Sequence, residues 1–567
     1  MKINKAKNQL ITLAIIFFGL FGLARTSHAA DFYIAQTAAG SGNGTSCANA
    51  KAYTWNWSGV QPGDTIWICG TINLVWGENV LVGASGSATT HTPVVLAFCD
   101  AGDCGGTYSP GVVQSVGQAD DIMIGSGMHD IVIDGKNVGV VQATNNGSAI
   151  DGYANQGSPV GVYVYGSTDH ITVQNLTIQK IYVHQYQTTT NDTAQNGMGL
   201  GIWFQGTTNA NVNNCTISDA ATGIVLGSGT SLVNVYDNTI KHCCMGISGG
   251  SGADDQTMDA IDVYDNDIEM GANWMSLDGN DCHANGIYLY SDGHPNLTSS
   301  TLTNAQFYNN YIHGPFAYWT NFPSGSVYGC TGFFHYDYGA GSGNIFFNNL
   351  VVAGPYINTS ASPNPSNGAV SWADLETLPK MWNNTVIGPW PGSWCFAGGT
   401  EAGGVSQSSD PDIRNNVCVN VADGTYDGFY KSQADYNDEN SFYAADIQGT
   451  GYSLANWKTA LGDSCTGTPP NATPANRECN SIATAPALSL SYVPTGAPLV
   501  QAGGNLSSYC ATYPALCYDK PLTVGAGSGA TAGAARPSSG AWDIGAYQYQ
   551  SGSGTTVPNG PTGLTVM

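Results

Sequence analysis

Basic residues are scarce in this chain of 567 residues. Lys and Arg together number 15, against 40 Asp and Glu, and all charged residues make up only 10% of the chain. A protein that binds nucleic acid or an anionic membrane surface needs a basic footprint, and this sequence has none. We therefore expect neither nucleic acid nor a membrane surface as a partner.

Long apolar runs are missing after residue 29, so no later segment predicts a membrane span. The first 29 residues have the pattern of a signal peptide: Lys2, Lys5 and Lys7 precede the apolar run LITLAIIFFGLFGLA, and Ser27 and Ala29 supply the small residues of a cleavage site. Cleavage would remove four basic residues and leave 11 against 40 acidic ones, a net charge of −29. We expect a bacterial protein that is secreted to the extracellular space, the periplasm or the cell surface, without membrane insertion and as a monomer.

CxxC pairs are also missing, although the chain has 15 cysteines, and this argues against a zinc site built from cysteines. In an exported protein, disulfides are the default state of cysteines. Proximity in the sequence predicts the pairs Cys47–Cys69, Cys99–Cys104, Cys465–Cys479 and Cys510–Cys517. Because the number of cysteines is odd, at least one thiol must be free or bond outside the chain.

What the chain does contain is a repeated phrase. Residues 235–243 read VYDNTIKHC, and 28 residues later the chain reads VYDNDIEMG. The second polar residue of the phrase recurs at steps of 24 to 44 residues, at Asn175, Asn214, Asn238, Asn266, Asn310, Asn349, Asn384 and Asn416. A fixed phrase with a variable spacer predicts repeated structural units that differ in their loops.

Each unit contains three short segments with strand-like alternation of apolar and polar residues. One segment precedes the marker asparagine, one follows it, and one opens with glycine, as in GVYVYG from Gly161 and GIWFQG from Gly201. Strands this short bury a continuous core only when successive coils stack on one another. The predicted fold class is all-β, a parallel β-helix with three short strands per coil and the marker asparagines hydrogen-bonded in a ladder at one corner.

At this point the sequence resembles a known group, the secreted bacterial right-handed parallel β-helix proteins of the pectate-lyase-like superfamily in the broad sense. The likeness rests on the start DFYIAQTAAGSGNGTSCANA with PGDTIWICGTI, on the Asn-marked coils, and on the end ARPSSGAWDIGAYQY, which is similar to the RP…DIGAYEY closing segment of many members. The resemblance implies a right-handed helix with an irregular, disulfide-containing C-terminal section. It leaves the activity open, because this fold carries lyases, hydrolases, isomerases and adhesins.

The organisation of the chain follows from these patterns. We predict a signal peptide at 1–29, an N-terminal cap with the first coils at 30–109, the β-helix core at 110–425, a capping section at 426–550 and a linker tail at 551–567. The capping section is expected because the open end of a β-helix would expose strand edges.

An aromatic row is predicted on the outer face of the glycine-opened strands. If Val162 and Ile202 point into the core, alternation places seven rings outside. These rings are Tyr163, Tyr165, Trp203, Tyr288, Tyr290, Phe334 and Tyr336. The spacers after Ile217 and Ile240 are very short and their neighbours are long, which predicts a groove beside the rings. Such a row favours contact with sugar rings, and burial of the rings under the long loops is the alternative.

Two acidic clusters accompany this face. The segment GADDQTMDAID brings Asp254, Asp255 and Asp259 together, as ligands for Ca²⁺ or, for Asp254 and Asp255, as the carboxylate pair of a glycosidase. A solvated acidic loop is the alternative. The segment LDGNDCHANG places Asp281 beside His283, which suits proton transfer, although an ordinary turn explains the pair as well.

These residues exclude one class of β-helix enzymes and leave several others open. The NTD, HG and RIK motifs of pectin hydrolases are missing, and every arginine of the mature chain lies late, so Lys241 is the candidate base for a lyase. The acidic charge repels polyuronates unless Ca²⁺, the one cofactor suggested, intervenes. We therefore expect a polysaccharide-cleaving protein, either a hydrolase with a carboxylate pair or a calcium-assisted lyase. The alternative is a non-catalytic extracellular glycan-binding or adhesion protein.

Overall fold

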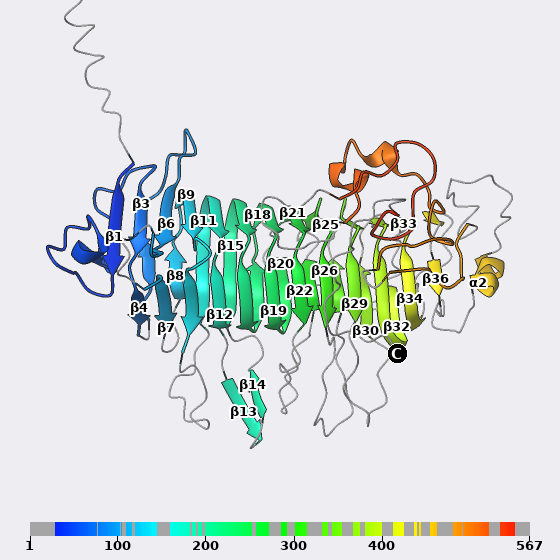
Figure 1. Cartoon of the computed structure of the whole chain (residues 1–567), viewed down its shortest axis with the longest axis horizontal. Coiled ribbons are helices and arrows are strands. Elements are labelled where there is room, and N and C mark those ends of the chain that lie inside the picture. Colours follow the sequence, from blue (N-terminus) through cyan, green and yellow to red (C-terminus); the bar gives the residue numbers. More distant parts are fainter. Residues whose placement is uncertain are drawn as a thin grey trace, which may run out of the picture.

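The structure is a computed structural model, and it describes the greater part of the chain from residue 29 onward. The described residues are 29–75, 77–102, 104, 109–115, 120–144, 159–181, 184–188, 191–194, 199–251, 257–270, 285–291, 301–314, 331–337, 343–353, 367–374, 380–399, 412–423, 436–438, 441–443, 454–461, 480–489, 492–520 and 533–549. They form an elongated stack of coils, seen side-on in Figure 1. The predicted fold class, an all-β parallel β-helix, is confirmed.

Each coil gives one strand to each of three parallel sheets. In one complete coil, β17 (Thr222–Leu226) lies in sheet 1, β18 (Ser231–Tyr236) in sheet 2 and β19 (Thr239–Cys243) in sheet 3. Each of them pairs in parallel with the equivalent strand of the coils before and after it. The chain thus winds through sheets 1, 2 and 3 once per coil.

Sheet 1 is formed by the glycine-opened strands. Its members are β5 (Val80–Val82), β8 (Asp120–Ile124), the first halves of β11 (Val160–Gln174) and β15 (Leu200–Asn213), β17, β20 (Met245–Ser251), β23 (Asn285–Ser291), β27 (Thr331–Asp337), β30 (Asn367–Asp374) and the second half of β32 (Thr385–Gly399).

Sheet 2 is formed by the strands that precede the marker phrase. Its members are β1 (Asp31–Ala35), β2 (Lys51–Ala52), β3 (Thr65–Ile68), β6 (Val94–Phe98), β9 (His129–Asp134), the second halves of β11 and β15, β18, β21 (Met258–Tyr264), β24 (Leu302–Thr303), β25 (Gln306–Tyr308), β28 (Ile345–Phe347), β31 (Lys380–Trp382), β33 (Asp412–Arg414) and β35 (Tyr436–Asp438).

Sheet 3 is formed by the strands that follow the phrase. Its members are β4 (Thr71–Leu74), β7 (Val112–Ser115), β10 (Val140–Ala143), β12 (Thr177–Ile181), β16 (Thr216–Ala220), β19, β22 (Asp267–Met270), β26 (Tyr311–Gly314), β29 (Leu350–Ala353), the first half of β32, β34 (Val417–Asp423) and β36 (Ser441–Tyr443).

The other described elements lie outside the three sheets. The antiparallel hairpin of β13 (His184–Thr188) and β14 (Asn191–Ala194) lies outside the stack of coils, below β12 and β19 in Figure 1. One α-helix, α2 (Leu454–Leu461), follows the last coils, and 3-10 turns span Cys47–Asn49, Ser507–Tyr509 and Pro514–Cys517. No helix among the described residues is long and apolar enough to cross a membrane.

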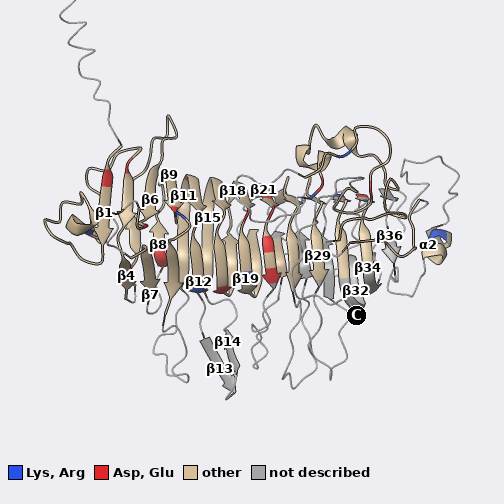
Figure 2. Ribbon diagram, in the orientation of Figure 1, with Lys and Arg blue, Asp and Glu red and all other residues tan. Residues whose placement is uncertain are grey.

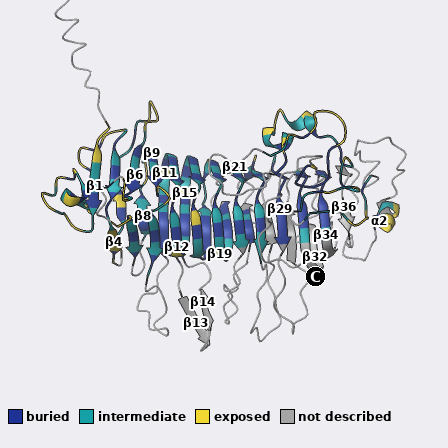
Figure 3. Ribbon diagram, viewed as in Figure 1, coloured by how far each residue is buried: buried dark blue, intermediate teal, exposed yellow. Residues whose placement is uncertain are grey.

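The inward side chains of the three sheets form one continuous apolar core. Equivalent residues stack from coil to coil, as Ile217, Ile240 and Ile268 do in sheet 3. All three are essentially inaccessible to solvent, and each side chain buried in this way contributes about 1.5–3 kcal/mol. Figure 3 shows the buried residues alternating with half-buried ones along the strands. Figure 2 shows how few charged residues the coils carry.

The asparagine ladder occupies the corner between sheets 2 and 3. Its members are Asn238, Asn266, Asn310, Asn349, Asn384 and Asn416, all of them buried. Each side-chain amide donates to the carboxamide oxygen of the next asparagine at 3.0–3.1 Å, up to Asn416 at the end of the ladder. Each amide also donates to a main-chain carbonyl, so the buried polar groups of the bend are satisfied.

Two of the eight predicted markers do not belong to this ladder. Strand register aligns Asn175 and Asn214 with Asp237, the residue before the ladder asparagine Asn238. The ladder position in these two coils is occupied by Leu176 and Cys215. Asn175 and Asn214 have φ of 54° and 52°, like Asp237 at 54°, and Asn and Asp tolerate this left-handed conformation. The prediction was wrong here because the phrases QN and NN were aligned by their second letter, although that letter fills the left-handed position.

Glycine is required where sheet 3 turns into sheet 1. A Cβ atom on Gly201 would lie 2.3 Å from the carbonyl oxygen of Gly223, and one on Gly223 would lie 2.6 Å from that of Gly246. Any side chain would therefore collide with the next coil. This close approach explains why the strands of sheet 1 open with glycine.

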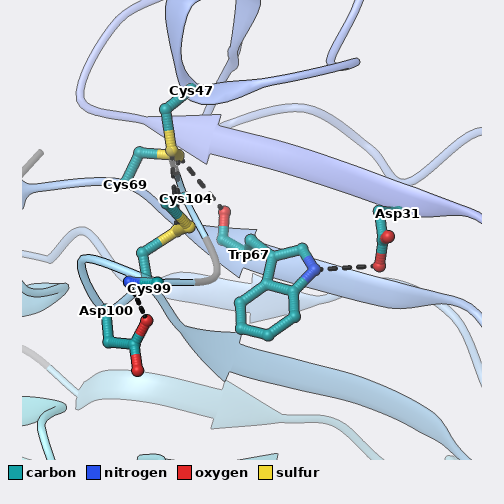
Figure 4. Close-up of a disulfide and its surroundings, with 8 residues drawn as sticks. Asp31, Cys47, Trp67, Cys69, Cys99, Asp100 and Cys104 are labelled. Carbon is teal, nitrogen blue, oxygen red and sulfur yellow. Dashed lines mark hydrogen bonds between the residues drawn. A yellow bond between two sulfur atoms is a disulfide. The ribbon is translucent and has the colours of Figure 1, made fainter. Parts of the chain in front are cut away.

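Disulfides stabilise the two ends of the described chain. The predicted pairs Cys47–Cys69, Cys99–Cys104 and Cys510–Cys517 are confirmed, while Cys465–Cys479 lies outside the described residues. In Figure 4 the first two disulfides lie side by side, with the sulfurs of Cys47 and Cys99 3.5 Å apart. Nearby, Trp67 Nε1 donates to Asp31 Oδ1 at 2.9 Å.

Two further cysteines are free thiols, which confirms the prediction that at least one thiol of the chain is free. Cys215 and Cys243 are both buried and unbonded. Cys244, which follows Cys243 directly, is in a disulfide. Of these two adjacent cysteines, Cys243 therefore has its thiol buried in the core, and Cys244, in the turn between β19 and β20, forms a disulfide.

The C-terminal section packs against the outside of the later coils. Its Leu506, Leu516 and Trp542 bury the outer side chains of Phe347 and Trp382 in sheet 2. Figure 1 shows this section along the side of the stack, over β29 and β33. The closing segment is held by Arg536, which donates to Asn348 Oδ1 at 2.9 Å and to the carbonyl of Gly545 at 3.1 Å.

The last coils extend past residue 425, where the sequence predicts that they end. β33 pairs with β35, and β34 pairs with β36, which ends at Tyr443. Leu454 of α2 belongs to the main core cluster. The role of 426–550 as a cap stays a prediction, together with the other segment boundaries.

Candidate functional site

The glycine-opened strands alternate in the way that the sequence predicts. Val162, Ile202 and Ile224 are fully buried in the core of sheet 1. The residues that alternate with these along β11 and β15, Tyr163, Tyr165 and Trp203, are half-buried on the outer face of the sheet. We call this face, from β8 to β27, the outer face of sheet 1.

The described rings on this face stack on one another. The Tyr163 and Trp203 ring centroids are 4.5 Å apart with an interplanar angle of 20°, and Tyr163 also stacks on Tyr165 at 5.3 Å. Tyr163 therefore uses its ring for stacking contacts within the protein. Tyr163 Oη donates to Gln205 Oε1 at 2.8 Å, which fixes the orientation of the phenol.

The predicted row is interrupted in its middle. Strand register places Trp203 beside Val225, then Ser248, Tyr288 and Phe334. At the next outward position the order runs from Tyr165 and Gln205 to Gly250, Tyr290 and Tyr336. Two aromatic groups are thus separated by two coils with small side chains, a span of about 14 Å between Trp203 and Tyr288 at the spacing of adjacent strands. The side chains of Tyr290, Phe334 and Tyr336 lie outside the described part of the structure.

The two central coils also have the shortest turns into sheet 1. Only Ala221 separates β16 from β17, and only Cys244 separates β19 from β20. By contrast, 18 residues separate β12 from β15, and 14 separate β22 from β23. These lengths agree with the spacers from which the sequence predicts a groove. Most residues of the long spacers, which would form the walls of that groove, lie outside the described part of the chain.

Asp120 is an acid on this face that the sequence did not single out as a site residue. It begins β8 beside Val160, and burial raises the pKa of its carboxyl group above the usual range. Burial also raises the pKa of Tyr163, with a smaller contribution from the charge of Asp120, so the two groups lie close together. The adjacent acids Asp120 and Asp121 are visible in the sequence. The sequence does not tell, however, which of the two side chains is buried, and the structure shows that Asp121 is fully buried while Asp120 is half-buried on the outer face.

The candidate catalytic residues are only in part described. Asp254, Asp255, Asp281 and His283 lie outside the described residues. Lys241 lies on β19 in sheet 3, with its ammonium 3.9 Å from Glu269 Oε2 and 44% of its side chain exposed. It is therefore on a different sheet from the aromatic face, one turn before β20.

Asp259, the third candidate calcium ligand, has protein partners. It is the second residue of β21 in sheet 2, and its Oδ1 accepts hydrogen bonds from Thr303 Oγ1 at 2.5 Å and Asn304 Nδ2 at 2.8 Å. Asp169 has the equivalent pair of partners three coils earlier, in Thr208 and Asn209. The contact of Asp259 thus also links coils.

Two groups among the described residues could hold a metal ion by proximity. One is Cys47, Cys69, Cys99 and Cys104, which are already paired in disulfides. The other is His91, Asp130 and His170 at the corner between sheets 1 and 2, whose ligand atoms lie within 4.8 Å of one another. The sequence contains a signal for this second group: HDIVI and DHITV begin successive strands of sheet 2 with His next to Asp.

Comparison with known proteins supports the fold. The family described as the right handed beta helix region matches residues 160–367. No curated protein sequence matches the chain at a significant level.

Among solved structures, a lacto-N-biosidase from Eubacterium ramulus is 12% identical, with 73% of this chain and 71% of that chain covered and a TM-score of 0.37. A rhamnogalacturonan lyase is 12% identical, with 68% and 87% covered and a TM-score of 0.41. XylC in complex with xylose is 8% identical, with 75% and 85% covered and a TM-score of 0.44. Similarity at this level carries no statement about what this protein binds.

Proposed function

This chain is a right-handed parallel β-helix protein, and we propose that it is exported and acts on a polysaccharide bound across the outer face of sheet 1. The observation that carries the proposal is the stacked group of Tyr165, Tyr163 and Trp203 with polar Gln205 and Asp120 beside it. Aromatic rings flanked by a few oriented polar groups are the usual composition of a sugar-binding surface.

The stacking of these rings defines where a sugar would lie. Tyr163 is covered by its neighbours, whereas one face of Trp203 is turned toward the next coil, where Val225 follows in the register. Among the described residues no aromatic ring stacks on that face of Trp203. A pyranose placed over Val225 would contact it with its apolar C–H face, and the chain would continue over Ser248 toward Tyr288.

For the reaction, we propose hydrolysis by a carboxylate pair. The acidic charge of the protein disfavours a polyanionic substrate. In addition, Lys241 lies on β19 in sheet 3 rather than on the aromatic face, with its ammonium group 3.9 Å from Glu269 Oε2. Asp254, Asp255, Asp281 and His283 remain the candidates, and Asp120 joins them because burial raises its pKa, as a general acid requires.

A panel of polysaccharides tests this proposal. The protein is incubated with neutral and acidic glycans, in the presence of Ca²⁺ or of a chelator, and new reducing ends are measured. Hydrolysis of a neutral glycan that survives chelation is the expected result. Release from uronates only, dependent on Ca²⁺ and lost in Lys241→Ala, would replace the hydrolase with a lyase.

The second candidate function is glycan binding without cleavage. It is favoured by the fact that, among the described residues, Asp120 is the one carboxylate whose charge raises the pKa of Tyr163, whereas a glycosidase needs a pair. In the same panel, retained glycan without any new reducing ends would identify a binding or adhesion protein. Neither retention nor cleavage of any glycan would reject the proposal.

A further inference from the structure

Three histidines and two aspartates converge where sheet 1 turns into sheet 2. They come from three successive coils: His91 precedes β6, His129 and Asp130 begin β9, and Asp169 and His170 lie in the middle of β11. Strand register places Asp169 beside His129. This cluster is separate from the aromatic residues of the proposed function and does not depend on them.

Asp130 is the centre of the cluster. Its side chain is only 2% exposed, and its two oxygens accept hydrogen bonds from His91 Nδ1 and His129 Nδ1, both at 2.8 Å. His91 and His170 are more open to solvent, and their rings stack at a centroid distance of 4.0 Å. A buried carboxylate therefore lies beneath two accessible imidazoles.

His170 is oriented by a second carboxylate. Its Nδ1 lies 2.5 Å from Asp169 Oδ2, which leaves Nε2 as the free ligand atom of the ring. Asp169 is itself fixed, since its Oδ1 accepts from Thr208 Oγ1 and Asn209 Nδ2 at 2.7 Å each. A carboxylate behind a histidine is the arrangement that orients histidine ligands in metal sites.

We propose that His91, His170 and Asp130 bind one divalent transition-metal ion of the zinc class, with Asp169 as a positioning residue. Their ligand atoms already lie within 4.8 Å of one another. With metal–ligand bonds of about 2.1 Å in a tetrahedron, His91 Nδ1 and Asp130 Oδ1 would separate from 2.8 Å to about 3.4 Å, and the proton that they now share would be released to solvent. Exposed His91 can make this small shift by rotation of its ring.

The donor set selects the metal. Two imidazoles and one carboxylate suit Zn²⁺, Ni²⁺ or Cu²⁺, whereas Ca²⁺ takes six to eight oxygens. Three protein ligands leave the fourth position of a zinc tetrahedron to water or to a ligand. Because its ligands come from three coils, the ion would also tie these coils together.

Metal titration of the intact protein, free of any histidine tag, tests the inference. After dialysis against a chelator, Zn²⁺ is titrated by calorimetry and Co²⁺ by its visible absorption. We expect one ion per chain and a higher melting temperature with Zn²⁺ but not with Ca²⁺. Asp169→Asn should keep this stoichiometry and weaken affinity about 10-fold or more, as loss of such a positioning contact does.

Two ligand variants and a matched control complete the test. His91→Asn and His170→Asn keep the left-handed backbone, because Asn209 has the same conformation, with φ of 50° against 53° at His170. His242→Asn is the control: its φ is 51°, and it lies in another coil beside Asp219. We expect the double variant His91→Asn/His170→Asn to lose the ion and the control to keep it. Absence of uptake by the unaltered protein, or full affinity in the folded double variant, would overturn the inference.

Discussion

Replacement of one ladder asparagine should destabilise the protein far more than replacement of a half-buried asparagine on the outer face of a sheet. Asn310 is fully buried, and its side chain makes four hydrogen bonds. Its amide donates to Val263 O at 2.9 Å and to Asn349 Oδ1 at 3.1 Å, and its oxygen accepts from the main-chain and side-chain nitrogens of Asn266 at 3.3 and 3.0 Å.

The magnitude follows from these contacts. Each lost hydrogen bond contributes about 1 kcal/mol, and a buried group left without a partner costs about 1–3 kcal/mol. In Asn310→Ala the main-chain NH of Asn266 and the carbonyl of Val263 lose the partner that Asn310 provides. Since Asn266 Nδ2 keeps its bonds to Val235 O and Tyr264 O, we expect a loss of about 3–5 kcal/mol in the free energy of unfolding.

Asn234→Ala is the matched control for this prediction. Asn234 lies two coils earlier, on the outer face of sheet 2, and its amide donates to Asn211 Oδ1 at 3.1 Å. We expect this variant to lose less than about 1 kcal/mol. Denaturation by guanidinium chloride, followed by circular dichroism, measures both. If Asn310→Ala were no less stable than Asn234→Ala, the ladder would not stabilise the corner.

Two further predictions concern titratable groups. Burial raises the pKa of Asp262 to about 6, so the folded protein holds this proton between about pH 4 and pH 6 while the unfolded chain releases it; stability should therefore fall as pH rises through this window. Asp262→Asn should remove that part of the pH dependence, and an unchanged stability profile would contradict the assignment. Burial also raises the pKa of Cys215 and Cys243 to about 12, so a thiol reagent should not label them in the native protein. The double variant Cys215→Ser/Cys243→Ser should show two fewer thiols after denaturation, and rapid native labelling of either residue would refute the buried position.

The fold could be predicted because each residue type that recurs in the repeat meets a particular structural requirement of the coil. Asparagine at the corner, alternating apolar residues in the strands and glycine at the close approach of Gly201 to Gly223 are visible without coordinates. The register was harder, since Asn175 and Asn214 are asparagines for the sake of a left-handed backbone rather than the ladder. Likewise, the end of the coils was placed too early, although residues 438–443 read DENSFY and thus contain the phrase.

The candidate sites were less predictable, because they depend on which coils face each other. Alternation placed Tyr163 and Trp203 outside, but it did not show that the two rings stack on each other. The cluster around Asp130 unites residues that are 38 to 41 positions apart from one coil to the next, and only the length of each coil brings them together. A search for acids that are close in sequence selected Asp259, whose described partners are Thr303 and Asn304.

The most direct test of the central claim is the affinity of a glycan for Trp203→Ala, with Tyr236→Ala as the control. Tyr236 stacks on Tyr264 on the outer face of sheet 2, so its removal also takes away a stacked outward ring, but far from sheet 1. With the glycan that the unaltered protein retains most strongly, we expect at least a 10-fold loss of affinity in Trp203→Ala and no change in Tyr236→Ala. Equal affinity in both variants would contradict binding on the outer face of sheet 1.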